Sequence, residues 1–452
     1  MRTRTSGGVR GGWGDPTLLL DPLDEELALL PGEFTPTLVE SMVRVGTWIP
    51  FEPAAKGMLN HFTKVDISAA TVRRKTERAG LAYVALQTAE VDRLERELPE
   101  APQGPAVQQL SVDGAMVPLL HKEWAEVKTL AIGTVGSAVF RKGEWQVHTE
   151  ALSYFSRLAD SDRFARLASV ETHRRGVETA GKVCAVNDGA VWEQTFVDLH
   201  RPDAVRILDW GHSTEYVAAA GQAVFGAGTP AFHEWFKVQL HELKHGDPQK
   251  VLGKLRGLLD EVGIQVRDGQ ESEALKTVRA SLEYLEKRQE QIRYAEFSAA
   301  GYPIGSGAVE SANKLVVEAR LKGAGMHWAR EHVDGMVALR NVVCSGRWEE
   351  AWPEISTRMR EEAKAGSARR RDERRADKAA SIAVPAVLAF AVEAASEISE
   401  PVAATSAPRA VASVEQKSAA GSRRPAANHP WRRMPIGRAR WSPPHQDASA
   451  KT

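Results

Sequence analysis

The sequence predicts a mixed α/β core that is interrupted by an all-helical insertion, preceded by a helical module and followed by a basic tail. Segments that alternate or run apolar with Thr and Val, as β-strands do, are concentrated in residues 108–208. Apolar residues at helical spacing dominate residues 215–297. Residues 401–452 contain no Leu, Phe or Tyr. Such a segment buries too little apolar surface to offset the entropy of ordering, so we expect a disordered tail.

The predicted core opens with three strands and continues with alternating helices and strands. The expected strands are 108–120, 127–135, 145–153, 181–186 and 204–208, and the expected helices are 160–175 and 188–200. This succession requires a mixed sheet with at least one crossover connection. The order of elements is that of the ribonuclease-H-like fold.

Two short helices across a tight turn are predicted before the core. The second begins after Ser68, a good N-cap residue, and is expected to end at Gly80. It carries the basic residues Arg73, Arg74, Lys75 and Arg78. This pattern is similar to a helix-turn-helix, which binds DNA. An ordinary helical hairpin with a solvated basic face explains it equally well.

Composition places the chain among ordinary globular proteins. The 452 residues include two cysteines, too few for a disulfide framework or a Cys-rich zinc site, which suits a reducing cytoplasm. The longest apolar stretch, 379–392, is too short to span a bilayer. We therefore expect a cytoplasmic protein without membrane contact.

The formal net charge of zero conceals an uneven distribution. The 59 Lys and Arg balance the 59 Asp and Glu over the whole chain. Residues 401–452, however, hold nine Lys or Arg and two Asp or Glu, a net of +7, so residues 1–400 sum to −7. This distribution permits a nucleic-acid partner that the total charge would disfavour.

Three acidic residues lie where the predicted fold can bring them together. Asp113 lies inside the first strand, Asp188 directly follows the fourth, and Glu310 lies in the first turn of a late helix. Carboxylates at strand ends can hold two divalent cations about 3.5–4 Å apart, and oxygen ligands favour Mg²⁺ or Mn²⁺. Each Asp taken alone is more simply a turn or a strand-end cap. Sequence spacing leaves their convergence open.

A fourth acidic residue, Asp209, follows the fifth strand, with His212 three residues further on. An Asp-x-x-His pair can support a metal site, bind the metal itself, or close a turn through a local hydrogen bond. Turn closure is the simplest interpretation of the pair on its own.

These motifs resemble bacterial insertion-sequence DDE transposases of the Kra-type group, which are related to Mutator-like transposases. The resemblance covers about residues 46–350, and its most specific block is Gly305–Trp328. The other matching blocks, in the same order, are 111–114, 187–192 and 208–212. Residues 429–433 in the tail are also similar to this group. The chain departs from the pattern at Gly211, where relatives often carry Tyr, and in its short Gly-rich N-terminus.

The resemblance implies a transposase that binds the terminal inverted repeats of an insertion sequence and catalyses metal-dependent strand cleavage and strand transfer. It implies that Asp113, Asp188 and Glu310 form the catalytic triad and bind two Mg²⁺ or Mn²⁺ ions, with Asp209 and His212 as accessory residues. Its partners would be the transposon ends and target DNA, and holding two ends together implies at least a homodimer on DNA. In bacteria such a protein would be cytoplasmic and would associate with the nucleoid when bound to DNA.

The implied organisation has six parts. They are an irregular N-terminus (1–35), a helix-turn-helix-like DNA-binding module (36–100), the first part of the core (106–214), the helical insertion (215–300), the last part of the core with the third acidic residue (301–350), and a charged, largely disordered tail (351–452).

Further basic and aromatic residues follow Glu310. Lys314, Arg320 and Lys322 are expected to contact backbone phosphates, which position DNA without reading its sequence, and Trp328 is expected to contact DNA by stacking. The alternative for Lys314 is a surface ion pair with Glu310, four residues away on one helical face.

Two other functions fit parts of the sequence. A catalytically inactive relic of a transposase would bind DNA without cutting it. His241-Glu242-x-x-His245 also matches the pattern of zinc proteases, although that site needs a third ligand. A chance match on a charged helix is the simpler explanation for this motif.

Overall fold

A computed structural model of the chain describes residues 34–141, 144–264 and 272–395. The chain divides into two compact units, Met1–Ala376 and Asp377–Thr452. The elements that follow belong to the first unit, except that the last helix extends into the second.

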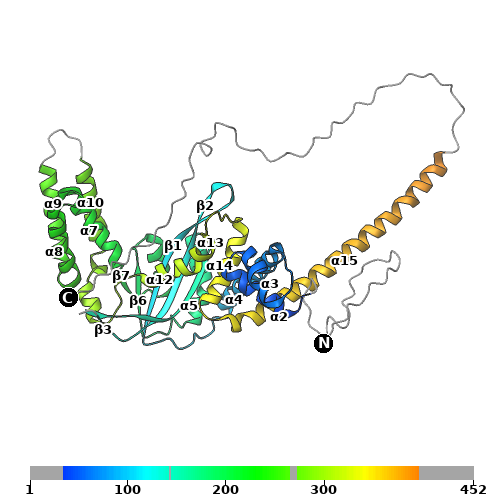
Figure 1. Cartoon of the computed structure of the whole chain (residues 1–452), viewed down its shortest axis with the longest axis horizontal. Helices are drawn as coiled ribbons and strands as arrows, with labels where there is room; N and C mark the ends of the chain where they lie inside the picture. Colours follow the sequence, from blue (N-terminus) through cyan, green and yellow to red (C-terminus); the bar gives the residue numbers. More distant parts are fainter. Residues whose placement is uncertain (1–33, 142–143, 265–271, 396–452) are drawn as a thin grey trace, which may run out of the picture. The chain divides into compact units, whose positions relative to one another are not determined.

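The centre of the first unit is a five-stranded mixed sheet with the order β5-β2-β1-β6-β7 (Figure 1). The strands are β1 (Val107–Pro118), β2 (Trp124–Val135), β5 (Thr149–Arg157), β6 (Lys182–Asn187) and β7 (Val205–Leu208). β2 pairs antiparallel with β1 and β5, whereas β6 pairs parallel with β1 and β7. The predicted mixed α/β fold is confirmed, and this sheet is compatible with a ribonuclease-H-like core.

The register between β1 and β6 places two of the predicted acidic residues side by side. Val107 pairs with Lys182 and Leu110 with Ala185 in the parallel ladder. The same offset, continued for three residues, brings Asp113 level with Asp188. Neighbouring strands lie about 4.8 Å apart. The sheet therefore fixes the approach of these two residues.

Two helices cover the part of the sheet around β1 and β2. They are α5 (Ser161–Arg174) and α6 (Val191–His200), close to the predicted ranges. Their aromatic residues Phe164 and Phe196 pack with Phe155 of β5 in one buried cluster. A short hairpin of β3 (Val139–Arg141) and β4 (Glu144–Gln146) occupies part of the region where a strand at 145–153 was expected. The third core strand is instead β5.

The described residues of the insertion after β7 form helices and their connections, as predicted, and the first helix begins earlier than residue 215. Its helices are α7 (Trp210–Phe225), α8 (Pro230–His245), α9 (Pro248–Ile264), α10 (Glu273–Glu286), the short 3₁₀ turn η3 (Gln289–Gln291) and α11 (Tyr294–Ala299). Leucines of these helices share one buried cluster with Val186 of β6 and Leu208 of β7. The insertion is therefore packed against the strand ends that carry Asp188 and Asp209.

The N-terminal helices differ from the prediction in length. They are α2 (Pro36–Trp48), the π-helical η1 (Pro53–Leu59), α3 (Asn60–Thr63) and α4 (Ala69–Glu97). The expected end of the second helix at Gly80 is wrong, because α4 continues through it. A Cβ at Gly80 would lie 2.4 Å from the carbonyl oxygen of Gly335. This glycine therefore serves a close helix crossing rather than a helix end.

The C-terminal part of the first unit returns to the sheet through α12 (Gly307–Ala312), the π-helical η4 (Asn313–Glu318), α13 (Ala319–Leu321) and α14 (Arg330–Cys344). Residues of α2, η1, α4 and α14 share one hydrophobic cluster with the first turns of α15 (Trp348–Ala395). The helices of residues 36–100 therefore have no hydrophobic core separate from α14 and α15 among the described residues.

In the segment 351–452, which was expected to be largely disordered, residues 351–395 are helical. Trp348, Trp352, Ile355 and Met359 recur at helical spacing and are buried, so the start of α15 has an apolar stripe that packs on the first unit. Residues 396–452, including 429–433, lie outside the described part of the chain, as do residues 1–33. No helix in the described ranges is long and apolar enough to cross a membrane.

Candidate metal centre

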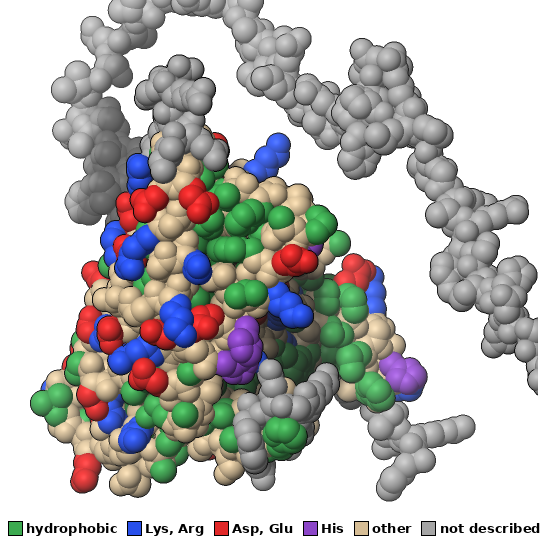
Figure 2. Space-filling model, turned by 90° about the vertical axis from the view of Figure 1, so that its left-hand side faces the viewer, with side chains coloured by type: hydrophobic (Ala, Val, Ile, Leu, Met, Phe, Trp, Pro, Cys, Tyr) green, Lys and Arg blue, Asp and Glu red, His purple; other side chains and the backbone are tan. Residues whose placement is uncertain are grey.

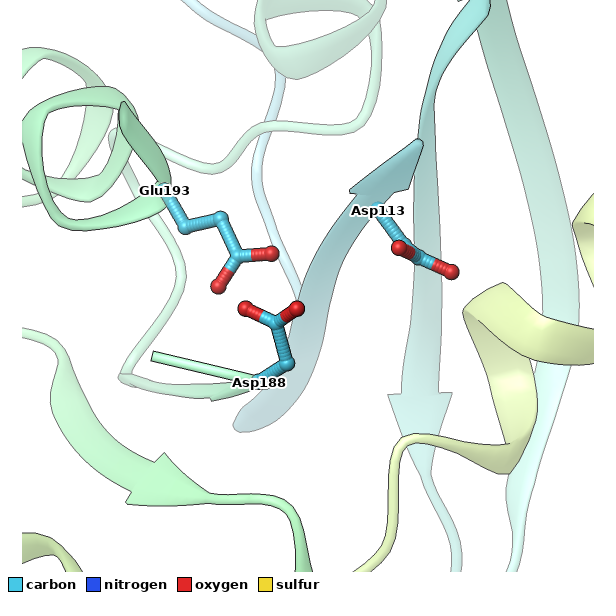
Figure 3. Close-up of side chains that lie close together, drawn as sticks. All are labelled: Asp113, Asp188 and Glu193. Atoms are coloured by element: carbon cyan, nitrogen blue, oxygen red, sulfur yellow. The ribbon is translucent and has the colours of Figure 1, made fainter. Parts of the chain in front are cut away.

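Three carboxylates meet beside the parallel strands. Asp113 projects from β1, Asp188 from the residue after β6, and Glu193 from the first turn of α6 (Figure 3). One carboxylate oxygen of each lies within 4.8 Å of the others. Within the described ranges this is the only set of three or more His, Cys, Asp or Glu residues arranged so closely.

The backbone around Asp113 and Asp188 is held by an asparagine between the strands. The side-chain oxygen of Asn187 accepts a hydrogen bond of 2.8 Å from the N–H of Val112. The carbonyl of the same Asn187 accepts one of 2.7 Å from the N–H of Asp209. Asn187 therefore ties β1, β6 and the residue after β7 together at the place where the carboxylates meet.

Glu193 is the residue of this cluster that the sequence analysis missed. Its side chain is 1% exposed, and one carboxylate oxygen accepts hydrogen bonds from the N–H groups of Gly189 (2.9 Å) and Ala190 (3.1 Å). Burial, followed by the hydrogen bond and charge of Asp188, raises the pKa of Glu193 to about 10. Glu193 follows the helix N-cap by three residues, as in a capping box, but the N-cap residue is Ala190 rather than Ser or Thr, so the sequence signature of that motif is absent.

Asp113 has an environment that suits a cation. Burial raises its pKa, and the nearby charge of Asp188 acts in the same direction. Its two carboxylate oxygens accept hydrogen bonds from the backbone N–H of Gly114 at 2.6 Å and from the side-chain amide of Asn313 at 2.8 Å. A divalent cation would relieve the repulsion between the two aspartates, because it is a large positive charge among oxygen ligands.

Asn313 supplies a second observation that favours a ligand at this place. Its side chain is 6% exposed and its amide oxygen has no hydrogen-bond partner, although its amide nitrogen binds Asp113. A buried unpartnered oxygen is costly. Carboxylate and amide oxygens are ligands that Mg²⁺ and Mn²⁺ prefer, so the aspartate pair and the unpartnered amide oxygen of Asn313 together fit such a cation.

Asp209 and His212 flank the cluster. Asp209 is the N-cap of α7: one oxygen accepts the N–H of Ser306 at 2.6 Å, and the other accepts the N–H of His212 at 2.9 Å. Although burial acts to raise it, the pKa of Asp209 is lowered by hydrogen bonds from His212 and Ser306.

The imidazole of His212 lies between two aspartates. Its Nδ1 is 3.4 Å from Asp209 and its Nε2 is 3.9 Å from Asp188. The hydrogen bond with Asp209 raises the pKa of His212 to about 9. Asp209 therefore closes the turn before α7, and the same carboxylate also joins the loop before α12 to α7.

Glu310 lies outside the three-carboxylate set. It is exposed in the first turn of α12, and its Oε1 accepts a hydrogen bond of 3.0 Å from the hydroxyl of Ser306. Asn313, the partner of Asp113, follows it by three residues, which is nearly one helical turn. Glu310 therefore lies on the segment that contacts Asp113, with its side chain open to solvent.

Two residues expected to contact DNA are in the interior. Arg320 is 2% exposed, and its guanidinium donates to the carbonyl of Gly46 and lies over the rings of Phe51 and Trp328. Trp328 is 7% exposed and donates its indole N–H to the carbonyl of Leu321. The predictions of phosphate contact by Arg320 and base stacking by Trp328 are wrong for this conformation, because both side chains fasten α13 to the N-terminal helices and the sheet.

The other predicted DNA-contacting residues have different surroundings. Lys314, Arg73 and Arg74 are exposed. Lys322 pairs with Glu318 at 2.7 Å, Lys75 lies over the ring of Phe34, and Arg78 donates to the carbonyl of Met359. On the face shown in Figure 2, basic and acidic side chains are interspersed. Arg73 is also within 3.9 Å of Glu77, so Arg74 and Lys314 are the exposed cations of this set for which no such ion pair is found in the described part of the chain.

The His-Glu-x-x-His motif lies at the end of α8. The rings of His241 and His245 are exposed, with centroids 5.2 Å apart. Glu242 is engaged by Lys250 at 2.9 Å and by the N–H of Asp247 at 3.0 Å. Neither histidine belongs to a set of three candidate ligands within the described ranges. The geometry does not favour a zinc protease.

No protein-family model and no curated protein matches this chain.

Proposed function

We propose that this chain is a DDE-type DNA transposase of the Kra-type insertion-sequence group, with a ribonuclease-H-like core. The observation that carries the proposal is the register of β1 and β6, which sets Asp113 level with Asp188 and brings their carboxylates within 4.8 Å. A carboxylate on β1 and one directly after the adjacent strand β6, together with the unpartnered amide oxygen of Asn313, suit metal-dependent phosphodiester chemistry.

Asp113 and Asp188 would hold Mg²⁺ or Mn²⁺, and Glu310 would complete the triad. The bound ions would activate the attacking hydroxyl and stabilise the leaving oxygen in an in-line displacement. The protein's own residues orient these ligands: Asn313 holds one oxygen of Asp113, and Asn187 sets the strands at their spacing.

His212 has the geometry to hold a proton beside the reacting groups. Its Nδ1 faces Asp209 and its Nε2 faces Asp188. Because the hydrogen bond with Asp209 raises the pKa of His212, the imidazole stays protonated at neutral pH and adds positive charge where phosphate would approach. Asp209 and His212 would thus act as accessory residues.

The DNA partners would be the two terminal inverted repeats and the target duplex. Arg74 on α4 and Lys314, which follows Asn313 in the chain, are exposed cations that can contact phosphates, and Arg73 could do so by leaving its ion pair with Glu77. Two ends are held together before strand transfer, so the active form would be a dimer or a larger assembly on DNA.

A strand-cleavage assay tests the proposal. The substrate is labelled duplex DNA carrying the genomic flanks on either side of the reading frame, with Mg²⁺ or Mn²⁺. We expect the wild type to nick one specific position and Asp188→Asn to lose more than about 100-fold of this activity, because loss of an outer-shell group alone costs metal sites 10–100-fold. His241→Ala is the matched control and should cleave normally. DNA binding without metal-dependent nicking would instead identify an inactive relic.

A further inference from the structure

Three side chains of the helical insertion form a stack beside Asp188. The ring of Tyr216 on α7 lies parallel to that of Tyr284 on α10, with centroids 3.8 Å apart and an interplanar angle of 13°. The guanidinium of Arg288 lies 3.7 Å from the centroid of Tyr284. We call these three residues the insertion clamp.

The clamp holds the backbone of the turn that carries the catalytic carboxylate. The hydroxyl of Tyr284 donates to the carbonyl oxygen of Asp188. Arg288 donates to the carbonyl oxygen of Gly189 through Nη2 at 2.5 Å and through Nε at 3.2 Å. A third bond, of 3.0 Å, joins Arg288 to the carbonyl of Tyr284 and keeps the two side chains together. Two consecutive carbonyls of the turn are therefore bound by the insertion.

Gly189 is shaped for this contact. Its φ is +87°, in the region that favours glycine, and a Cβ there would lie 2.4 Å from Nε of Arg288 and 2.9 Å from its Cδ. Only a residue without a side chain lets the guanidinium reach the carbonyl. The Asp-Gly sequence after β6 thus has a structural explanation that involves a helix about one hundred residues away.

The same turn is held from its other side by α6. Glu193 accepts the N–H groups of Gly189 and Ala190, while the clamp takes the carbonyls of Asp188 and Gly189. With both sets of backbone groups fixed, the direction of the Asp188 side chain toward Asp113 is determined by the insertion as well as by the sheet.

We propose that Tyr284 and Arg288, supported by Tyr216, are positioning residues that preorganise Asp188 for metal binding. This rests on the proposed metal-dependent function. The insertion then serves the chemistry directly, because its α10 end sets the orientation of a ligand on β6. Groups that orient metal ligands from outside the coordination shell typically alter affinity about 10–100-fold when removed.

Direct Mn²⁺ binding to the full chain, followed by electron paramagnetic resonance, tests the clamp without DNA. Tyr284→Phe removes a single oxygen and Arg288→Gln removes the stacked cation. Matched controls are Tyr154→Phe, a buried tyrosine of β5, and Arg256→Gln, an insertion arginine that pairs with Glu286. We expect the Mn²⁺ Kd to rise about 10–100-fold in the two clamp variants and to stay unchanged in the controls.

Cleavage kinetics supply a readout that a merely structural role would not move. In the clamp variants the Mn²⁺ concentration for half-maximal nicking should rise by the same factor, while kcat at saturating Mn²⁺ recovers to near the wild-type value. If Arg288→Gln does not fold, Tyr284→Phe carries the test alone. Wild-type Mn²⁺ affinity in a folded Tyr284→Phe overturns the clamp. Wild-type Mn²⁺ binding without any DNA cleavage overturns the proposed activity and leaves the binding comparison intact.

Discussion

Two glutamates, Glu193 and Glu310, differ in burial and in whether they belong to the close set with the aspartate pair. Glu193 is buried, belongs to the close set with Asp113 and Asp188, and has an oxygen committed to two backbone N–H groups. Glu310 is exposed, lies outside that set, and accepts one hydroxyl bond from Ser306. The resemblance assigns the third catalytic position to Glu310, whereas proximity alone would assign it to Glu193.

A glutamate that lies close to the aspartates is a metal ligand only if its carboxylate oxygens are free to bind the metal. A buried carboxylate with one oxygen already bound to two backbone N–H groups is explained by the fold alone. An exposed carboxylate on a short helix is free to turn toward a ligand. Asn313, on the same segment as Glu310, already contacts Asp113. Glu193 therefore acts as a cap for the Asp188 turn, and Glu310 is our candidate for the metal.

Glutamine substitutions at the two glutamates should have very unequal effects on metal-dependent nicking. We expect Glu310→Gln to reduce metal-dependent nicking more than about 100-fold, because it removes a ligand charge. Glu193→Gln keeps an oxygen that can accept both N–H bonds and should stay within about tenfold of the wild type. Single-turnover cleavage rates at saturating Mn²⁺ measure both. The reverse ranking would assign the third ligand to Glu193.

Much of this arrangement could be predicted from the sequence, because helices and strands leave their periodicity in short stretches of the chain. Hydrophobic alternation and helical spacing predict the order of the core elements, and they place Asp113 inside β1 and Asp188 directly after β6 for the same reason. Their convergence depends on the register of β1 and β6, which periodicity does not specify. The continuation of α4 through Gly80 depends likewise on a crossing with Gly335.

The errors come from contacts between residues far apart in the chain. Arg320 was expected on a phosphate track, but it binds the carbonyl of Gly46, 274 positions earlier. Tyr284 and Arg288 carry no recognisable motif, and only the fold brings them to the Asp188 turn. A basic or aromatic residue in a matching block can therefore be structural, and burial decides which role it has.

The pH dependence of the free energy of unfolding tests whether the buried carboxyl of Glu193 is protonated in the folded protein. Its pKa is raised from the usual 4.5 to about 10 in the folded protein, so the folded state binds this proton more tightly than the unfolded chain does. The stability contributed by the proton is complete below about pH 4.5 and is lost progressively as pH rises toward 10, by at most about 1.4 kcal/mol per pH unit.

We therefore expect urea unfolding in EDTA to show stability that declines from pH 5 to pH 9 more steeply for the wild type than for Glu193→Gln. Glutamine does not titrate, so it removes this contribution while keeping the cap. Burial also raises the pKa of Asp113, but its effect on stability is present in both proteins and cancels when the two curves are subtracted. Parallel pH curves for the two proteins would show that Glu193 is ionised in the native state.

We propose that Asp113 and Asp188 form a divalent metal site that Glu310 completes. Anomalous diffraction from crystals of the full chain with Mn²⁺ and a short duplex tests it most directly. We predict two Mn²⁺ peaks about 3.5–4 Å apart. Asp113, Asp188 and Glu310 should all contact Mn²⁺, and Glu193 should remain bound to the N–H groups of Gly189 and Ala190. An absence of Mn²⁺ at the aspartate pair, with DNA bound, would contradict the account.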